Sequence, residues 1–188
     1  MRLRIVLFCF LIFPCLASAQ KVSYAGMQQF SYLFSNIDRE TRISVVNGLR
    51  MNHFFTGLGF DLKLSNATSA YTGFYNVADV YADGRYYFGK NRHFFVKVDQ
   101  GFTFFPSKFP ETNFERYRGK YGYYAATSIG FKSKLGNDVS YCFDISGAFR
   151  QTRYERDYYD NFIRRNWTTE KYNIQQYFLI ISLGLEVF

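Results

Sequence analysis

The chain has 188 residues, and Tyr, Phe and Trp make up 22% of them. Its formal net charge is +8, from 23 Lys and Arg against 15 Asp and Glu, and its mean hydropathy is −0.21. So many apolar side chains exclude a disordered chain, and a helical membrane protein is excluded because no mature segment holds the roughly 20 consecutive apolar residues that a spanning helix needs. The length suits one domain, so we expect a single strand-rich domain.

The first predicted element is a secretory signal peptide at residues 1–19. Two arginines precede an apolar run from Ile5 to Leu16, and the tripeptide Ala17-Ser18-Ala19 offers the small residues that a signal peptidase accepts. A hydrophobic first strand or a retained anchor is the alternative, but a run of twelve residues is too short to cross a bilayer. We therefore expect the mature domain to comprise residues 20–188.

The cysteines give two further indications. Cys15 raises the alternative of a lipoprotein, which we disfavour because Pro14 stands before it where a small residue is expected. Removal of the leader takes two cysteines and leaves Cys142 alone, so no internal disulfide can form. Two arginines leave as well, which lowers the formal charge from +8 to +6. A secreted domain without disulfides needs another means of closure, and a sheet closed on itself provides one.

Beyond the leader, apolar and polar residues alternate with a period of two, which predicts strands. In one such segment, Phe94 and Val98 share one parity, whereas Lys97 and Asp99 share the other. The same alternation predicts eight strands, at residues 24–35, 41–51, 54–64, 74–88, 94–105, 121–133, 138–152 and 172–187.

The connections between these strands alternate in length. Those after the second, fourth and sixth strands are short and rich in Gly and Asn, which tolerate the positive φ of tight turns. Those after the other strands are mostly longer. An antiparallel barrel in an outer membrane has this asymmetry, with short periplasmic turns and longer external loops. The short turns are predicted at 52–53, 89–93 and 134–137, and the longer loops at 36–40, 65–73, 106–120 and 153–171.

One parity of the predicted strands is rich in Gly, Ser and Ala and carries charges of both signs in equal number. Small residues suit the crowded interior of a narrow barrel, and an interior shut off from water demands that buried charges neutralise one another. We therefore predict a paired charge network in the lumen. Its members are the bases Arg50, Lys63, Arg85, Lys97, Lys132 and Arg150 and the acids Asp61, Asp79, Asp83, Asp99, Asp144 and Glu186.

The opposite parity carries large apolar side chains, with Tyr and Phe recurring near the strand ends. In an outer-membrane barrel this face contacts lipid, and its aromatic residues form girdles at the two interfaces. The alternative is a soluble sandwich whose core these aromatic residues fill. Strands of about 11 residues tilted near 45° cross a bilayer, so the strand lengths agree with the membrane interpretation.

Glycines and aromatics form five motifs: Asn47-Gly48-Leu49-Arg50, Thr56-Gly57-Leu58-Gly59-Phe60-Asp61, Asp83-Gly84-Arg85-Tyr86-Tyr87-Phe88-Gly89, Ser128-Ile129-Gly130-Phe131-Lys132-Ser133-Lys134-Leu135 and Leu183-Gly184-Leu185-Glu186-Val187-Phe188. In them, and over nearly all of its mature length, the chain resembles the small outer-membrane β-barrel proteins of the Bacteroidetes type. The resemblance implies the barrel fold and insertion by the barrel-assembly machinery, and it says little about function. One departure concerns Phe188, because the final aromatic of the usual assembly signal lies on the lipid-facing parity and Phe188 falls on the other. A bulge near the end or an atypical recognition would account for it.

The sequence is poor in the groups that an enzyme needs. His53 and His93 both fall on predicted periplasmic turns, away from the external rim, and we interpret them as solvated turn residues. We interpret Cys142 as a small interior residue rather than a catalytic thiol. Asp79 and Asp83 share a strand face, but nearby Arg and Lys would keep both ionised, so a structural role is the better interpretation than an acid and base pair. Metal-ligand spacings are absent, and we expect no cofactor.

The surplus of basic residues lies in turns and loops, so it does not form a nucleic-acid-binding stripe. Loop bases at an outer leaflet could bind phosphate or carboxylate groups of a surface glycolipid, and simple solubility is an alternative of equal weight. The loop at 153–171 is the best candidate for a contact surface, although it could merely extend the last hairpin. Its contact candidates are Tyr158, Tyr159, Arg164, Arg165 and Trp167.

We predict an all-β fold, an eight-stranded antiparallel up-and-down transmembrane barrel in a bacterial outer membrane. Eight strands leave an interior just wide enough for side chains to fill, so we expect a non-enzymatic protein with a filled lumen. Its expected role is structural or is a surface interaction through the external loops, with outer-membrane lipid as one partner. The alternatives are a soluble secreted barrel that binds a hydrophobic ligand, a small porin, and a rim enzyme, for which an external His is missing.

Overall fold

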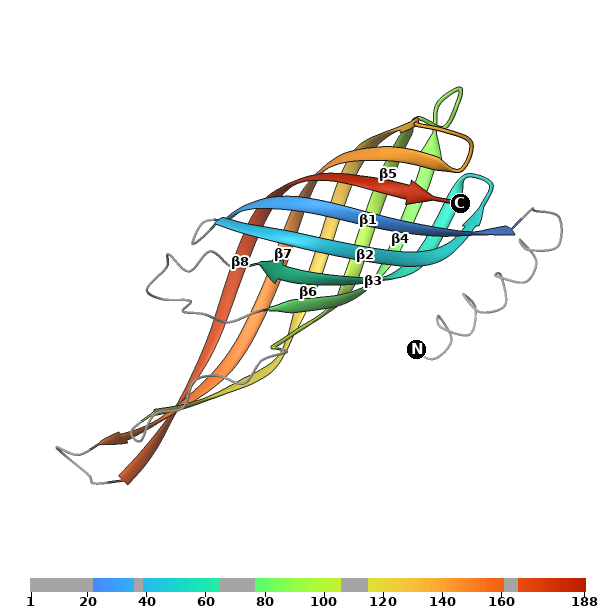
Figure 1. The fold of residues 1–188 in the computed structure, drawn as a ribbon. Coiled ribbons are helices and arrows are strands. Elements are labelled where there is room, and N and C mark those ends of the chain that lie inside the picture. Colours follow the sequence, from blue (N-terminus) through green and yellow to red (C-terminus); the bar gives the residue numbers. More distant parts are fainter. Residues whose placement is uncertain (1–21, 36–38, 65–76, 106–114, 161–165) are drawn as a thin grey trace, which may run out of the picture.

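The computed structural model describes residues 22–35, 39–64, 77–105, 115–160 and 166–188, and Figure 1 gives its fold. In this part of the chain, no helix has the length and apolarity that crossing a membrane requires. The predicted signal peptide lies outside the described residues and stays a prediction. The strands are β1 (Val22–Ser35), β2 (Arg39–Met51), β3 (Phe54–Leu64), β4 (Ala78–Phe88), β5 (Phe94–Phe104), β6 (Glu115–Lys134), β7 (Val139–Asp160) and β8 (Asn166–Val187).

Each strand pairs antiparallel with the next, and β8 pairs with β1, so the sheet closes into a barrel. Phe30 of β1, for instance, lies opposite Ile43 of β2 on one side and Leu183 of β8 on the other. The predicted fold class is therefore confirmed. Closure leaves the barrel wall without an unpaired edge, so the backbone itself supplies the cohesion that a disulfide would otherwise add, and Cys142 is a free thiol.

The two ends of the barrel differ. Three short turns, at residues 52–53, 89–93 and 135–138, lie at one end, which we call the short-turn end. These turns agree with the predicted ones, and two of them use positive φ, at Asn52 (52°), Gly89 (86°) and Arg92 (56°). The opposite end, which we call the long end, carries the two longest connections, from β3 to β4 and from β5 to β6. The loop predicted at 36–40 is wrong in its last two residues, which begin β2, so the connection from β1 to β2 at this end is short.

The last three strands are longer than the alternation predicts. The loop predicted at 153–171 is wrong over most of its length, and the loop predicted at 106–120 is wrong in its last six residues, because both contain strand. Both faces of this added strand carry charged and tyrosine side chains, so no apolar face reveals it by periodicity. We call residues 115–120, 153–160 and 166–173 the extension. It projects beyond the barrel at the lower left of Figure 1.

A β-bulge on β6 separates the extension from the barrel wall. Lys120 pairs with Arg153 whereas Tyr123 pairs with Gln151, so two residues of β6 lie opposite one residue of β7. In the barrel wall the odd-numbered residues of β6 face outward, and in the extension, on the other side of the bulge, the even-numbered residues do. As a result, the basic residues of β6 in the extension share a face with Arg153.

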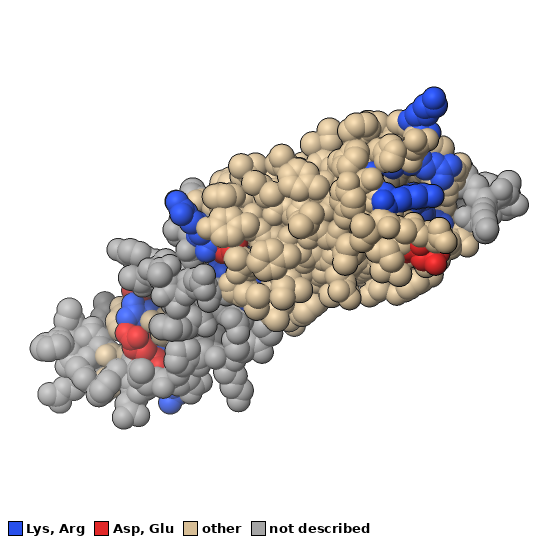
Figure 2. All heavy atoms as spheres, turned by 45° about the horizontal axis from the view of Figure 1, so that its top comes forward, with Lys and Arg blue, Asp and Glu red and all other residues tan. Residues whose placement is uncertain are grey.

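The outward face of the barrel wall is uncharged. Leu58, Phe102 and Leu183, for example, expose 71%, 65% and 60% of their surface. Figure 2 shows the resulting belt, free of Lys, Arg, Asp and Glu, between charged side chains at the two ends. No outward-facing position of the described wall carries a charge over residues 24–34, 41–51, 54–64, 80–88, 94–104, 121–133, 139–151 and 175–187.

Aromatic rings gather on the outward face at both ends of this belt. Near the short turns the ring centres of Phe94 and Phe131 lie 5.7 Å apart, and towards the long end those of Phe149 and Tyr177 lie 5.3 Å apart. Tyr141 and Phe149 mark the two levels on β7. The eight steps between them span about 26 Å along the strand, and a tilt of about 40° shortens this to about 20 Å, close to the apolar band of a membrane barrel, about 25 Å tall.

The inward face accommodates several large rings because glycines on neighbouring strands leave room for them. A Cβ atom added to Gly59 would lie 2.3 Å from the ring of Tyr81, and one added to Gly130 would lie 2.1 Å from the ring of Phe95. Both distances are far below a van der Waals contact. The glycines predicted to suit a narrow interior therefore lie directly against the side chains that fill it.

Candidate functional site: the barrel interior and its two ends

All twelve charged residues that the sequence assigns to the lumen lie on the inward face. Eleven of them are buried, and Arg50 is partly exposed at the short-turn end. The structure adds two that the sequence analysis missed, Glu40 and Arg42, which are 1% and 2% exposed. Arg42 has the same parity as Arg50 and was detectable, but the apolar Val46 between them interrupts the polar pattern. The interior thus holds seven acids and seven bases among the described residues.

Charges at the long end form one connected cluster. The Arg150 guanidinium lies 3.0 Å from a carboxylate oxygen of Glu40 and 2.8 Å from one of Asp79. Lys63 pairs with Glu40 at 2.6 Å, and Arg42 pairs with Asp61 and approaches Asp79 to 3.7 Å. Because each side chain has a partner of opposite sign, the cost of removing these charges from water is offset within the cluster.

The middle of the lumen holds a second set of pairs. Arg85 donates to Asp83 from Nε and Nη2, at 2.9 and 2.7 Å. Lys97 lies 3.2 Å from Asp99 and 3.8 Å from Asp144. The Arg85 guanidinium also lies over the ring of Phe95, 5.4 Å from its centre, so charge and ring together occupy the cross-section.

Little free space remains between these two sets. A cavity of about 10 Å³ lies among Arg42, Asp61, Lys97 and Tyr124, which is room for about one water molecule. Tyr81 borders the same cavity and donates to Asp61 at 2.7 Å.

The side chains considered as catalytic candidates form hydrogen bonds and ion pairs within the lumen. Asp79 accepts from Thr103 at 2.5 Å and from Arg150, whereas Asp83 is held by Arg85, so the two carboxylates do not act on a common point. The Cys142 thiol lies 3.7 Å from a carboxylate oxygen of Glu186. Among the described residues, no group of three His, Cys, Asp or Glu side chains is arranged to hold a metal ion.

Both histidines lie at the short-turn end, as the sequence indicates. The His93 ring stacks on Phe131 with centres 5.8 Å apart, and its Nδ1 lies 2.9 Å from the Lys132 carbonyl oxygen, to which it donates. The His53 ring lies 6.2 Å from that of Tyr86. These contacts place His93 in a structural role that anchors a turn to the neighbouring strand.

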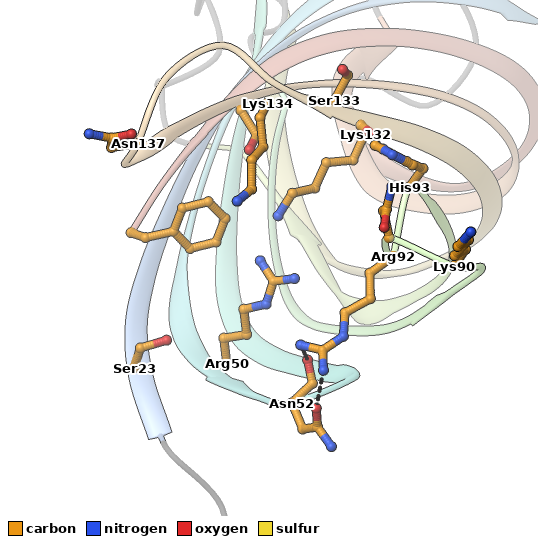
Figure 3. Close-up of a pocket in the computed structure, with 13 residues that line it drawn as sticks. Ser23, Arg50, Asn52, Lys90, Arg92, His93, Lys132, Ser133, Lys134 and Asn137 are labelled. Atoms are coloured by element: carbon orange, nitrogen blue, oxygen red, sulfur yellow. Dashed lines mark hydrogen bonds between the residues drawn. The ribbon is translucent and has the colours of Figure 1, made fainter.

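The short-turn end opens into a cavity of about 940 Å³, which we call the basin (Figure 3). At its base, Glu186 accepts from Arg50 at 3.3 Å and pairs with Lys132 at 2.7 Å. Phe188 lies on the basin side of the wall, with its ring centre 4.9 Å from the Arg50 guanidinium and 4.1 Å from the Lys132 amino group. The β7 and β8 ladder runs without a register shift to Val187, so no bulge returns Phe188 to the outward face.

The predicted contact residues belong to the extension rather than to a loop. Tyr158 and Tyr159 lie on β7 and Trp167 lies on β8, whereas Arg164 and Arg165 lie outside the described residues. The rings of Tyr159 and Trp167 are 5.7 Å apart.

The outward face of the extension is basic. It carries five cationic side chains and two acidic ones, because the bulge brings three bases of β6 onto it. Arg118 is 57% exposed and pairs with Asp157 at 2.9 Å, and the Arg116 guanidinium lies 4.9 Å from the ring centre of Trp167. The cations on this face are Arg116, Arg118, Lys120, Arg153 and Lys171, and the acids are Glu155 and Asp157.

The pKa values of two carboxyl groups in the extension are lowered. A hydrogen bond from Thr169, followed by Arg118, lowers the pKa of Asp157. A hydrogen bond from Arg156 lowers the pKa of Glu115. Both groups are therefore held in their charged forms by partners on neighbouring strands.

No model of a protein family matches the sequence, and the search of curated proteins finds no match. The structure is similar to the crystal structure of Neisserial surface protein A (NspA), with a TM-score of 0.58 and 8% sequence identity over 89% of this chain and 98% of that chain. The likeness is one of fold. A KdgM porin in complex with disordered oligogalacturonate also matches, at 10% identity over 86% of this chain and 98% of that one, but its TM-score of 0.25 is too low to carry an argument. The resemblance to Bacteroidetes-type barrels stays a prediction.

Proposed function

We propose that the protein is a non-enzymatic, integral barrel of a bacterial outer membrane, with a closed lumen and with its long end at the cell surface. The observation that carries the proposal is the sorting of side chains across the wall. The described outward face is an uncharged belt with aromatic rings at both ends, and the inward face holds fourteen charged residues. This sorting is that of a barrel in lipid.

The soluble alternative fits this sorting poorly. A secreted barrel that binds a hydrophobic ligand requires an apolar interior and a polar exterior, and here both are reversed. In water the belt would be an apolar patch far larger than the few hundred Å² that soluble monomers expose. Extraction decides between the two: the membrane protein should remain in the membrane fraction until detergent is added, and release by osmotic shock alone would contradict the proposal.

Paired charges and large rings support the closed lumen. The 10 Å³ cavity between the charge clusters is far too small for a solute, which disfavours the small-porin alternative. Purified protein in planar bilayers should therefore give no stable conductance, although a true porin run in parallel does. Reproducible channels would overturn the closed lumen and leave the membrane location standing.

The extension supports a surface-interaction role. Its basic outward face continues the lipid-facing side of the wall and lies directly beyond the belt, where phosphate and carboxylate groups of a surface glycolipid would meet it. Trp167 (45% exposed) adds an amphipathic ring at the same level. With the barrel held in detergent, a variant in which Arg116, Arg118 and Lys120 are replaced by Gln should lose the binding of an added anionic glycolipid that the parent shows. Unchanged binding would exclude this surface as the contact.

A further inference from the structure

The basin at the short-turn end breaks the charge balance that holds elsewhere in the barrel. Five cationic side chains line it, and no carboxylate side chain does. Glu186 lies at its base, where it ion-pairs with Arg50 and Lys132. The lining cations are Arg50, Lys90, Arg92, Lys132 and Lys134.

Three of these cations have no opposite charge to neutralise them. Lys90, Arg92 and Lys134 form no ion pair with any residue that the structure describes, and Arg50 and Lys132 share the single carboxylate of Glu186. Figure 3 shows Lys132, Lys134 and Arg50 turned towards the same space. Like charges that converge in a partly enclosed cavity repel one another, and an anion between them relieves this repulsion. The basin therefore attracts anions.

The cations at the base are held in place rather than free to swing into water. The Arg50 guanidinium lies between two rings, 4.6 Å from the centre of Tyr87 and 4.9 Å from that of Phe188. Lys132 lies beside the same rings and against Glu186. Because the side chains are already ordered, a ligand that binds them does not have to supply that ordering cost.

At the rim, Arg92 is held by hydrogen bonds to the turn between β2 and β3. It donates to the carbonyl oxygen of Asn52 at 3.0 Å and to the side-chain oxygen of the same residue. Arg92 has a φ of 56°, a left-handed conformation in which Gly or Asn would be less strained. The protein thus places a long cation at a strained position and ties it to the mouth of the basin.

The remaining lining groups suit a ligand rich in oxygen. Amides and hydroxyls surround the cations, and the Oγ atom of Ser140, in a residue only 1% exposed, has no hydrogen-bond partner among the described residues. A volume of about 940 Å³ lies in the range of small-molecule sites. The lining amides and hydroxyls belong to Ser23, Asn52, Asn91, Ser133, Asn137 and Ser140, and His93 and Phe188 complete the lining.

We propose that the basin binds a compact polyanion, a molecule that presents two or more phosphate or carboxylate groups to its five cations. All of its residues belong to the described short-turn end, so the site does not depend on the membrane location. If the barrel also has the orientation proposed above, the basin opens to the periplasm. Its ligand is then distinct from any glycolipid that the extension contacts at the opposite end.

The test measures binding of two inorganic or simple organic probes to the folded barrel in detergent by titration calorimetry. Tripolyphosphate represents phosphate groups and citrate represents carboxylates, and a neutral trisaccharide is the control. We expect saturable binding of at least one anion at one site and none of the neutral sugar. The tighter of the two anions identifies the chemical class. Absence of binding by both anions at low ionic strength would overturn the proposal.

A pair of matched variants locates the site. Lys90→Gln with Lys134→Gln removes two exposed lysines of the rim and leaves the bonds of Arg92 intact, so the fold should survive. Lys120→Gln with Lys171→Gln removes two lysines from the extension and changes the net charge equally. We expect the rim variant to bind at least tenfold more weakly and the extension variant to bind within twofold of the parent. Equal weakening in both would mean attraction by net charge alone and would refute a site in the basin.

Discussion

Arg85 and Asp83 lie two residues apart on β4 and form a two-contact ion pair inside the barrel, with the side chains of both fully buried. Removing one partner of such a pair leaves a charge that neither water nor protein neutralises. The pair is therefore one of the places where the barrel is most sensitive to a change of a single charge.

We predict that Asp83→Asn lowers the free energy of unfolding by about 3 to 5 kcal/mol, because it leaves Arg85 buried without its carboxylate. Urea titrations followed by the gel shift between unboiled and boiled samples would measure the loss. Asp138→Asn, in an exposed turn, is the control and should change stability by no more than about 0.5 kcal/mol. Similar values for the two variants would mean that the buried pair is not stabilising.

The glycines beneath the interior rings give a second prediction. Gly130→Ala places a methyl group against the ring of Phe95, which has little space to move, so we expect a loss of about 1 to 3 kcal/mol. Gly147→Ala is the matched control, because a Cβ atom there would meet nothing within 4 Å. The same urea titration compares the two variants, and an equal response would show that the contact with Phe95 does not limit the side chain at position 130.

The belt gives a third prediction, which concerns the membrane. Ile145 lies on the outward face of β7 midway between Tyr141 and Phe149, at the level where lipid is most apolar. We expect Ile145→Arg to reduce stability in lipid vesicles by about 2 to 4 kcal/mol, and Gln151→Arg, at the edge of the belt, by about 0 to 1 kcal/mol. Unfolding in vesicles measures both. No dependence on depth would argue against a lipid-facing wall.

The sequence predicts the barrel wall well because alternation, glycine content and turn chemistry all agree there. Twelve lumen charges could be assigned by parity alone, yet parity does not give the partners. Glu40 pairs with Arg150 across 110 positions of the chain, and only the barrel closure brings them together. The basin could not be foreseen for the same reason, because three turns that are distant in sequence assemble it.

The extension escaped prediction for a different physical reason. Residues such as Tyr154 and Tyr172 stack across strands, with ring centres 4.7 Å apart, in a sheet that has no hydrophobic core on either side. Cross-strand aromatic and charge pairs stabilise such a sheet, and they leave no period of two in the sequence.

Those charge pairs give a last prediction, on pH. The pKa values of Asp157 and Glu115 are lowered by partners on neighbouring strands, so their stabilisation is present above the ordinary Asp and Glu values, near about 3.9 and 4.3. It is lost as pH falls through the lowered values. We therefore expect the extension to stay ordered from pH 8 to about pH 5 and to loosen below about pH 4, while the barrel wall stays closed.

Trp167 reports this change directly, because it is the only Trp in the chain and lies against Arg116 and Tyr159 in the extension. Its emission should shift to the red below about pH 4, and Asp157→Asn, which removes the charge that Arg118 holds, should shift it already at pH 7. Lys171→Gln is the control, since Lys171 forms no ion pair with a described residue. A shift between pH 8 and pH 6, where neither carboxyl group titrates, would show that other groups hold the extension together.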